Sequence, residues 1–372
     1  MTTTGEESEL LRSAVRDALK QLAASEDVRR AMATARGYED RTWQRLSREL
    51  GLPGLTIAEE HGGAGLTEAE LGIAVEEAGA SLLCAPLFAT AGLALPLLKA
   101  LDDEEAIARY APPIAAGELT ATVALAEDSG SWQLAAVTTA ASQDDDGWLL
   151  NGVKNYVVDG ATAGLILVVA KDGAGGLGAF ALGQNAPGLA IEQLVTLDQT
   201  RKQARLTLSN ARAQRVGAAD ATAAIARATA VSRALLAAEQ AGGAQRCLDM
   251  TVEYAKARIQ FGRAIGSFQA IKQRLAEMLI RTESAKSAAY AALEAAASGT
   301  EDLEHVAAVA ALTAGEAYGY VTAQTVQLHG GIGFTWEHDA HLYFKRARAS
   351  AILLGTASEL TDLIGRQLAA II

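Results

Sequence analysis

Cysteine and proline are scarce in this chain of 372 residues, and each shortage excludes a class of protein. The only two cysteines, Cys84 and Cys247, each lie within an apolar helical pattern. We therefore expect two buried free thiols rather than a disulfide framework or a thiolate metal cluster. With six prolines, half of the residues hydrophobic and a fifth charged, the composition is that of an ordered globular protein.

Basic residues are outnumbered, and the net charge of −12 disfavours a general nucleic-acid binder, which needs clustered Lys and Arg. The N-terminal segment is acidic, and no apolar core of signal-peptide type follows it. The longest apolar stretch, Cys84 to Leu98, is too short to cross a membrane and is interrupted by Pro86, Gly92 and Pro96. We expect a soluble cytoplasmic protein with no nucleic-acid and no membrane partner.

The hydrophobic pattern divides the chain into three parts. Helical periodicity extends to about residue 118, and Thr67 with Glu70 fits a capping box at one helix start. Short runs rich in Val, Leu, Ile and Thr follow, separated by Asp, Gly and Asn clusters, with SQDDDGW as an exposed turn. After Asp220, a candidate N-cap, helical patterns return. The sequence predicts an α+β chain with a helical domain at 1–118, a β domain at 119–217 and a helical domain at 218–372.

The segment YAKARIQFGRAIGSFQAIKQRLAEM predicts a helix, a turn with a protruding aromatic side chain, and a second helix. Around the break at Gly262 it carries Arg258, Phe261 and Gln269. An Arg can pair with phosphate oxygens, a Phe can stack on a planar heterocycle, and a Gln can hydrogen-bond an amide-like edge or a ribose. The alternative is an ordinary helical hairpin with Phe261 in the core.

A second segment, QLHGGIGFTWE from Gln327 to Glu337, ends a helix at two adjacent glycines. Such glycines permit a left-handed backbone and the close approach of a ligand, or they simply terminate the helix. Read alone, this segment leaves both interpretations open.

The two segments together, in this order in a helical, β, helical chain, resemble the acyl-CoA dehydrogenase family of FAD flavoproteins over nearly the whole length. The resemblance implies an N-terminal helical domain, a middle β domain of barrel or sandwich type and a C-terminal four-helix bundle. It implies FAD extended across a subunit interface, an acyl-CoA substrate, an electron acceptor, no metal, and a dimer or tetramer formed with itself or with a homologous subunit. The positions that match the clasp on a neighbour's FAD are Arg258, Phe261, Gln269, Gln327, His329, Gly330 and Gly331.

The flavin end of the resemblance is altered. In the family, two threonines and a tryptophan near the ends of two strands meet the flavin ring. Ala126 and Val158 stand at the matching threonine positions, and Tyr156 stands at the tryptophan. Two side-chain hydrogen bonds are therefore absent, each worth about 1 kcal/mol. Thr356 matches another position that touches FAD.

The catalytic base is altered as well, because abstraction of the α proton of a thioester needs a carboxylate. Most of the family has a glutamate directly before a Gly-Thr pair, where this chain has Leu354. A minority has it at the position of Ser232, beside a matched substrate-side arginine, Arg233. The best surviving candidate is Glu239, two turns further along the same helix. The alternative is that Glu239 forms an ion pair with a neighbouring arginine such as Arg233, or with helix partners.

Three further observations shape the functional interpretation. Thr356 and Glu359 fit a capping box, which favours a structural role for Glu359. His338 and His341 lie on a predicted helix with a spacing that could ligate a metal, but no second carboxylate cluster supports one. Small residues on the substrate-side helix hint at room for a wide acyl group: Ala237, Ala238, Gly242 and Gly243.

The sequence resembles the base-less subunit of heteromeric bacterial acyl-CoA dehydrogenases that act on bulky CoA thioesters such as steroid side chains. We expect a chain that clasps the FAD of its partner. The alternatives are a self-sufficient homo-oligomeric dehydrogenase that uses Glu239, a relative that activates oxygen, and a purely structural helical protein.

Overall fold

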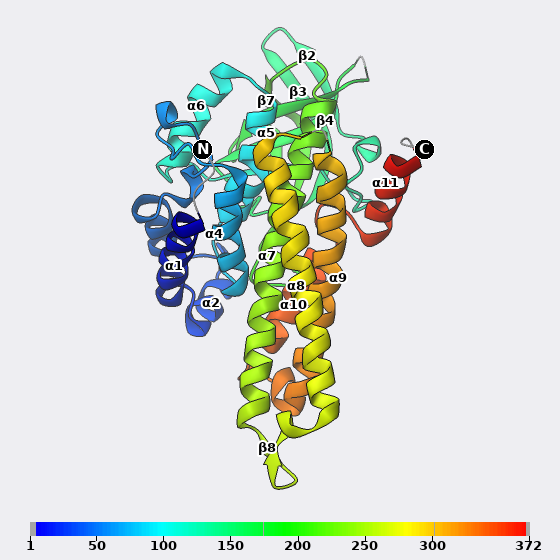
Figure 1. Ribbon diagram of the computed structural model, residues 1–372. Coiled ribbons are helices and arrows are strands. Elements are labelled where there is room, and N and C mark those ends of the chain that lie inside the picture. The colour runs from blue at the N-terminus through cyan, green and yellow to red at the C-terminus, as the bar shows by residue number, and fades with distance from the viewer. Residues whose placement is uncertain (1–4, 174, 301, 370–372) are drawn as a thin grey trace. The chain divides into compact units, whose positions relative to one another are not determined.

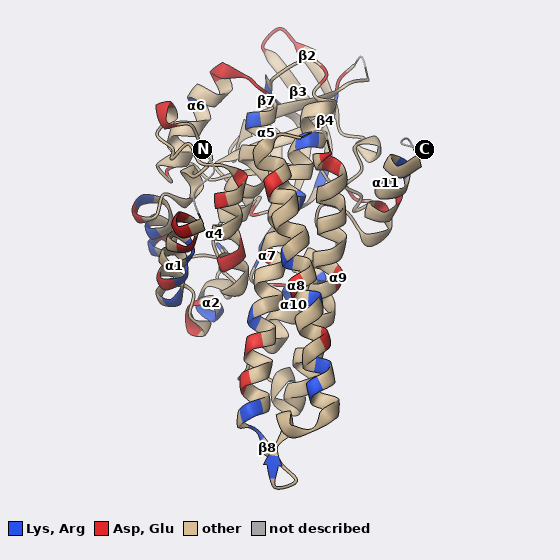
Figure 2. Ribbon diagram, in the orientation of Figure 1, with Lys and Arg blue, Asp and Glu red and all other residues tan. Residues whose placement is uncertain are grey.

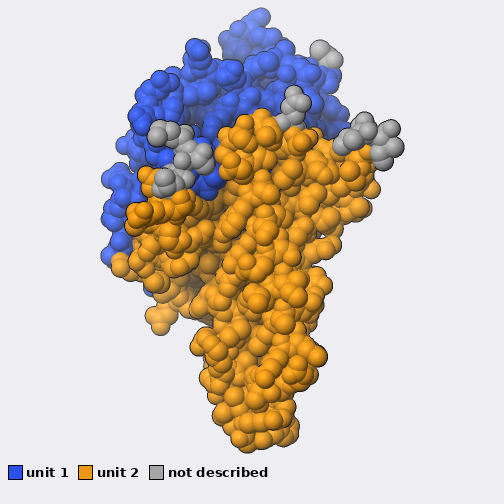
Figure 3. All heavy atoms as spheres, in the orientation of Figure 1, with its two compact units in different colours: residues 1–2, 30–71, 84–232 blue, residues 3–29, 72–83, 233–372 orange. Residues whose placement is uncertain are grey.

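The computed structural model describes residues 5–173, 175–300 and 302–369 (Figure 1). The chain forms two compact units, each assembled from separate stretches of sequence (Figure 3). Unit 1 is built mainly from residues 30–71 and 84–232, and unit 2 from residues 3–29, 72–83 and 233–372. The three-domain boundaries expected from the sequence, at 118/119 and 217/218, stay a prediction.

The N-terminal third is helical, as predicted, and two of its helices are irregular. Beside α-helices, it has π-helical stretches at Arg45–Glu49 and Phe88–Ala94. The capping box is confirmed at the start of α4, because the Glu70 carboxylate accepts from both Thr67 N and Thr67 Oγ1. The helices are α1 (Gly5–Leu22), α2 (Ser25–Met32), α3 (Asp40–Gln44), α4 (Glu68–Ala80), α5 (Leu95–Ala100) and α6 (Glu104–Ala115).

The middle of the chain is a seven-stranded sheet within unit 1. Five strands pair in a ring, β4 to β2, β3, β7, β5 and back to β4, which gives the barrel-like form expected. β1 pairs parallel to β4, and β6 pairs antiparallel to β7. The strands are β1 (Ala121–Ala124), β2 (Ala140–Asp144), β3 (Gly147–Val158), β4 (Leu165–Lys171), β5 (Leu177–Gly183), β6 (Leu189–Gln193) and β7 (Gln203–Val216).

Two strands were not predicted. β2 and β3 extend from either side into the segment expected to be an exposed turn, so that the turn itself is only Asp145 and Asp146. β6 alternates between half-buried and exposed residues, and it pairs only with β7 at the edge of the sheet. Their weak apolar patterns explain why neither strand was recognised.

Long helices form the C-terminal part: α7 (Thr222–Ala257), α8 (Gln269–Ser298), α9 (Leu303–His329), α10 (Ala340–Ser350) and α11 (Ala357–Ala369). Within unit 2, α7 to α10 pack side by side as the predicted four-helix bundle (Figure 1). Hydrogen bonds link α7 to its neighbours, from Lys286 of α8 to Gln245 and from Thr251 to Thr325 of α9. Asp220 precedes the helix and accepts from Thr222 N at 3.0 Å.

Glycines let α4 and α7 approach each other closely in unit 2. A Cβ on Gly79 would lie 2.0 Å from the carbonyl oxygen of Glu239, and one on Gly242 would lie 1.9 Å from that of Glu76. Only glycine allows this separation, which fixes the position of the helix segment that carries Glu239.

The two cysteines are free and buried, as predicted. Among the described helices, none is both long and apolar enough to cross a membrane.

Candidate functional site

A short hairpin joins α7 to α8 and projects one aromatic side chain. Its strands are β8 (Ile259–Gln260) and β9 (Arg263–Ala264), and the turn residues Phe261 and Gly262 have φ of 53° and 77°. Two positive φ angles are typical of the tight turns that match the twist of a hairpin. Phe261 at the tip is 91% exposed, so the alternative that placed it in the core is wrong.

The hairpin is also basic. From Arg258 to Gln269 the chain has two arginines and no acidic residue. Figure 2 shows Lys and Arg in blue at the end of α7 and in the hairpin. The Arg263 guanidinium lies 4.0 Å above the Phe268 ring, whereas the Arg258 side chain is exposed. Gln269, the first residue of α8, is exposed too. Phosphate-binding and stacking groups are therefore present together on an open surface.

The second predicted segment lies at the same end of the bundle. α9 ends at His329, and Gly330 has φ 62° and ψ −141°, a conformation that favours glycine. A Cβ on Gly330 or Gly331 would have no atom within 4 Å, so this turn is open. The His329 ring stacks on Tyr254 of α7 at 4.3 Å, which brings this turn close to the end of α7.

His329 is buried and only half satisfied. Its Nδ1 donates to the Thr325 carbonyl at 2.8 Å, and its Nε2 has no partner among the described residues. Burial lowers the pKa of this imidazole, which keeps it neutral near pH 7. A neutral histidine can still stack and hydrogen-bond, but it brings no positive charge to the turn.

The position expected for the base is occupied by a strained, buried leucine. Leu354 is 3% exposed and has φ of 64°, and its carbonyl accepts from Arg233 Nε at 2.9 Å. Arg233 therefore holds the turn before Thr356. Ser232, at the alternative base position, is 3% exposed. Neither position offers a carboxylate.

Glu239 is held in a buried ion pair. Its Oε1 accepts from Arg346 Nη1 of α10 at 2.7 Å, and the two side chains are 5% and 4% exposed. The sequence favoured an ion pair but named Arg233 as an example of the partner, and that choice is wrong. Sequence reasoning missed Arg346 because the two residues lie 107 positions apart and meet only through the packing of α10 on α7.

The residues after Leu354 behave as predicted. Thr356 N donates to Glu359 Oε2 at 2.9 Å, and Thr356 Oγ1 donates to the same oxygen at 3.1 Å. This capping box starts α11 and accounts for Glu359 without catalysis. The contact of Thr356 with FAD stays a prediction.

One histidine was misplaced by the sequence. His338 precedes α10 rather than lying on it, and its Nδ1 accepts from Ala340 N at 3.1 Å. His341 lies within α10 with its Nε2 unpartnered among the described residues. No group of three or more His, Cys, Asp or Glu side chains in the described part of the chain could hold a metal ion.

Within unit 1, the strand ends that match the family's flavin site offer few side-chain hydrogen-bonding groups. Ala126 and Val158 are each 1% exposed and apolar. A β-bulge in β3 places Asn155 and Tyr156 opposite one residue of β7 and leaves the Tyr156 side chain 37% exposed. Asn155 N donates to the Ala126 carbonyl at 2.9 Å, so this backbone oxygen is already engaged.

A buried ion pair rigidifies this region. Lys154 Nζ donates to Glu127 Oε1 at 2.8 Å and to the Leu125 carbonyl at 2.9 Å. Burial alone would raise the pKa of Glu127, but hydrogen bonds from Lys154, Thr138 and Thr139 outweigh it and lower that pKa to about 2. The pair is a structural element that sequence reasoning did not identify.

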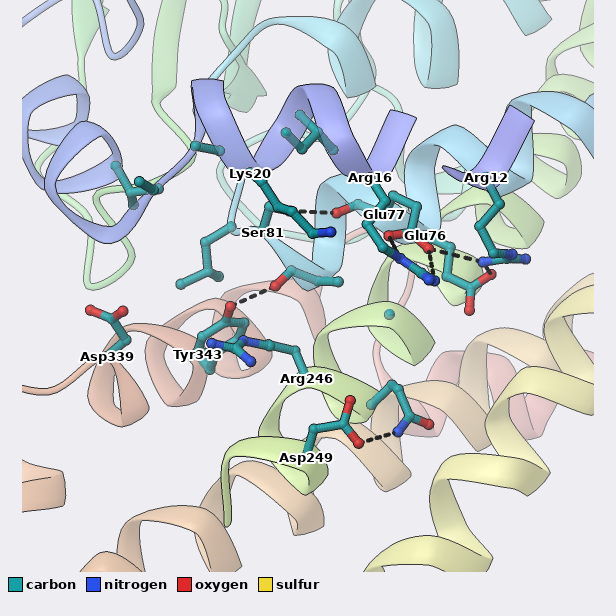
Figure 4. Close-up of a pocket in the computed structure, with 18 of the residues that line it drawn as sticks. Arg12, Arg16, Lys20, Glu76, Glu77, Ser81, Arg246, Asp249, Asp339 and Tyr343 are labelled. Carbon is teal, nitrogen blue, oxygen red and sulfur yellow. Dashed lines mark hydrogen bonds and ion pairs between the residues drawn. The ribbon is translucent and has the colours of Figure 1, made fainter. Parts of the chain in front are cut away.

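A cavity of about 900 Å³ lies in unit 2 between α1, α4, α7, α8 and α10 (Figure 4). It contains two further buried carboxylates, Glu76 and Glu77. Arg12 Nη1 donates to Glu76 at 2.8 Å, and Arg16 donates to both oxygens of Glu77 at 3.0 and 2.8 Å. Tyr290 also donates to Glu76, at 2.8 Å. These carboxylates fasten α1 to α4 and are poor candidates for a base.

Three family descriptions match successive parts of the chain. The acyl-CoA dehydrogenase N-terminal domain matches residues 5–118, the middle domain matches 122–211 and the C-terminal domain matches 221–369. Acyl-CoA dehydrogenase IpdE2 of Mycobacterium tuberculosis is 37% identical over 360 residues, which is 96% of each chain. The chain belongs to the acyl-CoA dehydrogenase family.

Solved structures of other acyl-CoA dehydrogenases share the fold. A variant of the Tcur3481–Tcur3483 steroid ACAD has a TM-score of 0.91 and 32% identity, with 99% of both chains covered. The ChsE4–ChsE5 complex from Mycobacterium tuberculosis has a TM-score of 0.90 and 28% identity, with 99% of this chain and 98% of that chain covered. The predicted fold class and FAD as the family's cofactor are thereby confirmed.

The residues of this dehydrogenase fit the adenine and pyrophosphate end of FAD better than its flavin end. The exposed Phe261 and Arg258 and the open Gly330–Gly331 turn offer stacking, charge and close approach. The apolar Ala126 and Val158 offer the flavin ring no side-chain hydrogen bond. The chain thus has the residue types predicted to clasp FAD and lacks two of the hydroxyls predicted to meet the flavin ring.

The expected room for a wide acyl group is not provided by the two glycines of α7. The space beside Gly242 is filled by the backbone of α4, and a Cβ on Gly243 would lie 2.6 Å from the Tyr318 ring. That hint is wrong for both glycines.

Proposed function

We propose that this chain is the subunit without a catalytic base in a heteromeric acyl-CoA dehydrogenase, and that its clasp holds part of the FAD used by a homologous partner. The observation that carries the proposal is the Glu239–Arg346 ion pair, because it engages the best surviving candidate for the base. Leu354 and Ser232 leave both of the family's glutamate positions without a proton acceptor.

The position of the clasp supports a role toward another chain. Arg233, whose hydrogen bond to the Leu354 carbonyl holds the Leu354–Thr356 turn, lies about a third of the way along α7, and the hairpin follows the end of this helix. The helix from Arg233 to Ala257 is roughly 36 Å long at about 1.5 Å per residue. Arg258 and Phe261 are therefore distant from Thr356 of the same chain, as expected if they meet a neighbour's cofactor.

In this proposal the clasp residues bind and orient, and the partner supplies the base. FAD, when bound, accepts the hydride from the β carbon of the acyl-CoA thioester. Arg258 would hold the phosphate oxygens of the partner's FAD, Phe261 would offer a stacking face, and Gln269 with the Gln327–Gly331 turn would complete the binding surface. A carboxylate of the partner takes the α proton.

We further propose that the assembled enzyme accepts a bulky CoA thioester, such as one that carries a steroid side chain. The similarity to the Tcur3481–Tcur3483 steroid ACAD supports this substrate class.

The test is expression of the chain alone and together with a glutamate-bearing homologue encoded beside it. We expect little FAD and no turnover from the chain alone, and a flavin-containing complex that oxidises a bulky acyl-CoA. Stoichiometric FAD and turnover by the isolated chain contradict the proposal and favour the self-sufficient homo-oligomer.

A further inference from the structure

A groove in unit 2 has features of a second ligand site, separate from the clasp. It lies between α9 on one side and α10 and α11 on the other, with α7 as its floor, and has a volume of about 470 Å³. That size is within the range of small-molecule sites. Most of its lining is apolar, including Leu236, Ala311, Ala323, Ala347, Leu353 and Leu360.

Two glycines of α9 keep the groove open. A Cβ on Gly319 would meet no atom within 4 Å, and one on Gly315 would meet only the Gln240 amide nitrogen at 3.9 Å. Glycine in a helix interior costs about 0.5–1 kcal/mol relative to alanine. Neither position is crowded, so packing within unit 2 does not require these glycines.

Gln240, on the floor of the groove, is a buried carboxamide that the fold does not satisfy. The residue is 3% exposed, and its Oε1 has no hydrogen-bond partner among the described residues. Leaving a buried acceptor unpaired destabilises the folded state. Rotation of the amide about its last torsion can turn either the oxygen or the nitrogen toward the groove. A ligand hydroxyl can satisfy either atom.

The rim of the groove carries two arginines and one glutamate. Arg281 donates to Glu277 at 2.7 Å and lies 4.4 Å from the Tyr320 ring. Arg348 lies above the Phe344 ring at 4.9 Å, and no carboxylate in the described part of the chain pairs with it. Because Glu277 neutralises Arg281, Arg348 is the positively charged rim residue that can receive an anionic head group.

We propose that this groove binds an amphiphile with an apolar body, a hydroxyl at its inner end and a carboxylate at its outer end. The hydroxyl pairs with the Gln240 carboxamide, the body lies along Gly315 and Gly319, and the carboxylate meets Arg348. An ω-hydroxy fatty acid represents this class.

The proposal is tested by calorimetric titration of the chain, in complex with its partner, with 12-hydroxydodecanoate and with dodecanoate. We expect the hydroxy acid to bind about tenfold more tightly, because only it satisfies the buried amide. Equal affinities for the two acids, or no binding of either, overturn the proposal.

Two variants locate the site independently. Gly319→Leu fills the groove and should weaken the hydroxy acid at least tenfold, whereas Gly365→Leu, at an equally open helical glycine outside the groove, should leave affinity unchanged. Gln240→Leu should remove the preference for the hydroxyl while dodecanoate still binds. Unaltered affinity in Gly319→Leu, or an undiminished hydroxyl preference in Gln240→Leu, places the ligand elsewhere and refutes the assignment.

Discussion

Replacement of Glu239 by Gln separates a structural ion pair from a catalytic base. The substitution leaves the Arg346 guanidinium, 4% exposed, without its counter-charge. Breaking a buried pair from one side costs about 3–5 kcal/mol, against a typical total stability of about 5–15 kcal/mol. For a cooperative unit of about 150–250 residues, in which 1 kcal/mol shifts Tm by about 2–4 °C, that loss corresponds to a fall of roughly 6–20 °C in Tm.

The assay combines calorimetric melting with turnover of the assembled enzyme well below the new Tm. We expect Glu239→Gln to lower Tm while the folded complex keeps its turnover within about twofold. The paired replacement Glu239→Leu with Arg346→Met serves as the control, since it removes both charges at similar volume and should restore most of the stability. An unchanged Tm with a loss of turnover would refute the reasoning and make Glu239 the base.

The remaining predictions concern the clasp, the helix packing and the pH dependence. Phe261→Ala should lower the FAD affinity of the complex at least fivefold. It should change the unfolding free energy of the chain by less than about 0.5 kcal/mol, because the side chain is 91% exposed. The control is Phe334→Ala, at a side chain that is 82% exposed at the same end of the bundle, and equal loss of flavin in both variants would contradict a specific role for Phe261. Gly242→Ala should cost about 2–4 kcal/mol in urea unfolding, because its Cβ would lie 1.9 Å from the Glu76 carbonyl, whereas Gly365→Ala in open space should be neutral or stabilising. The pKa of Glu127 is lowered to about 2, so its stabilisation is present above pH 4.5 and lost as the pH falls toward 2. Glu127→Gln should therefore flatten the acid limb of stability against pH, and an unaltered limb would show that other carboxylates dominate it.

The sequence predicted the parts of the fold that rest on local patterns. The helical periodicity of α7 to α9, the capping boxes at Thr67 and Thr356 and the protruding Phe261 follow from residues close together in the chain. β2 and β6 were not predicted because β2 is short and largely exposed and β6 is a half-exposed edge strand, so neither shows a distinct apolar alternation.

In the candidate site, too, the sequence predicted what depends on local residues and missed what depends on packing between distant segments. The substitutions at Leu354 and Ser232 are legible in the sequence once the family is identified. The partner of Glu239 was not, because Arg346 reaches it only through packing of α7 and α10. Likewise, the sequence suggested free space beside Gly242 and Gly243, but α4 and the Tyr318 ring occupy it.

The central claim is that the chain clasps FAD for a partner that carries the base. Its most direct test is the FAD content, read from the flavin absorbance bands, of a complex in which only this chain carries Arg258→Ala and Phe261→Ala. We predict that the complex still assembles but loses most of its FAD and its turnover, although the partner is unaltered. Full FAD occupancy and normal turnover in that complex would contradict the account.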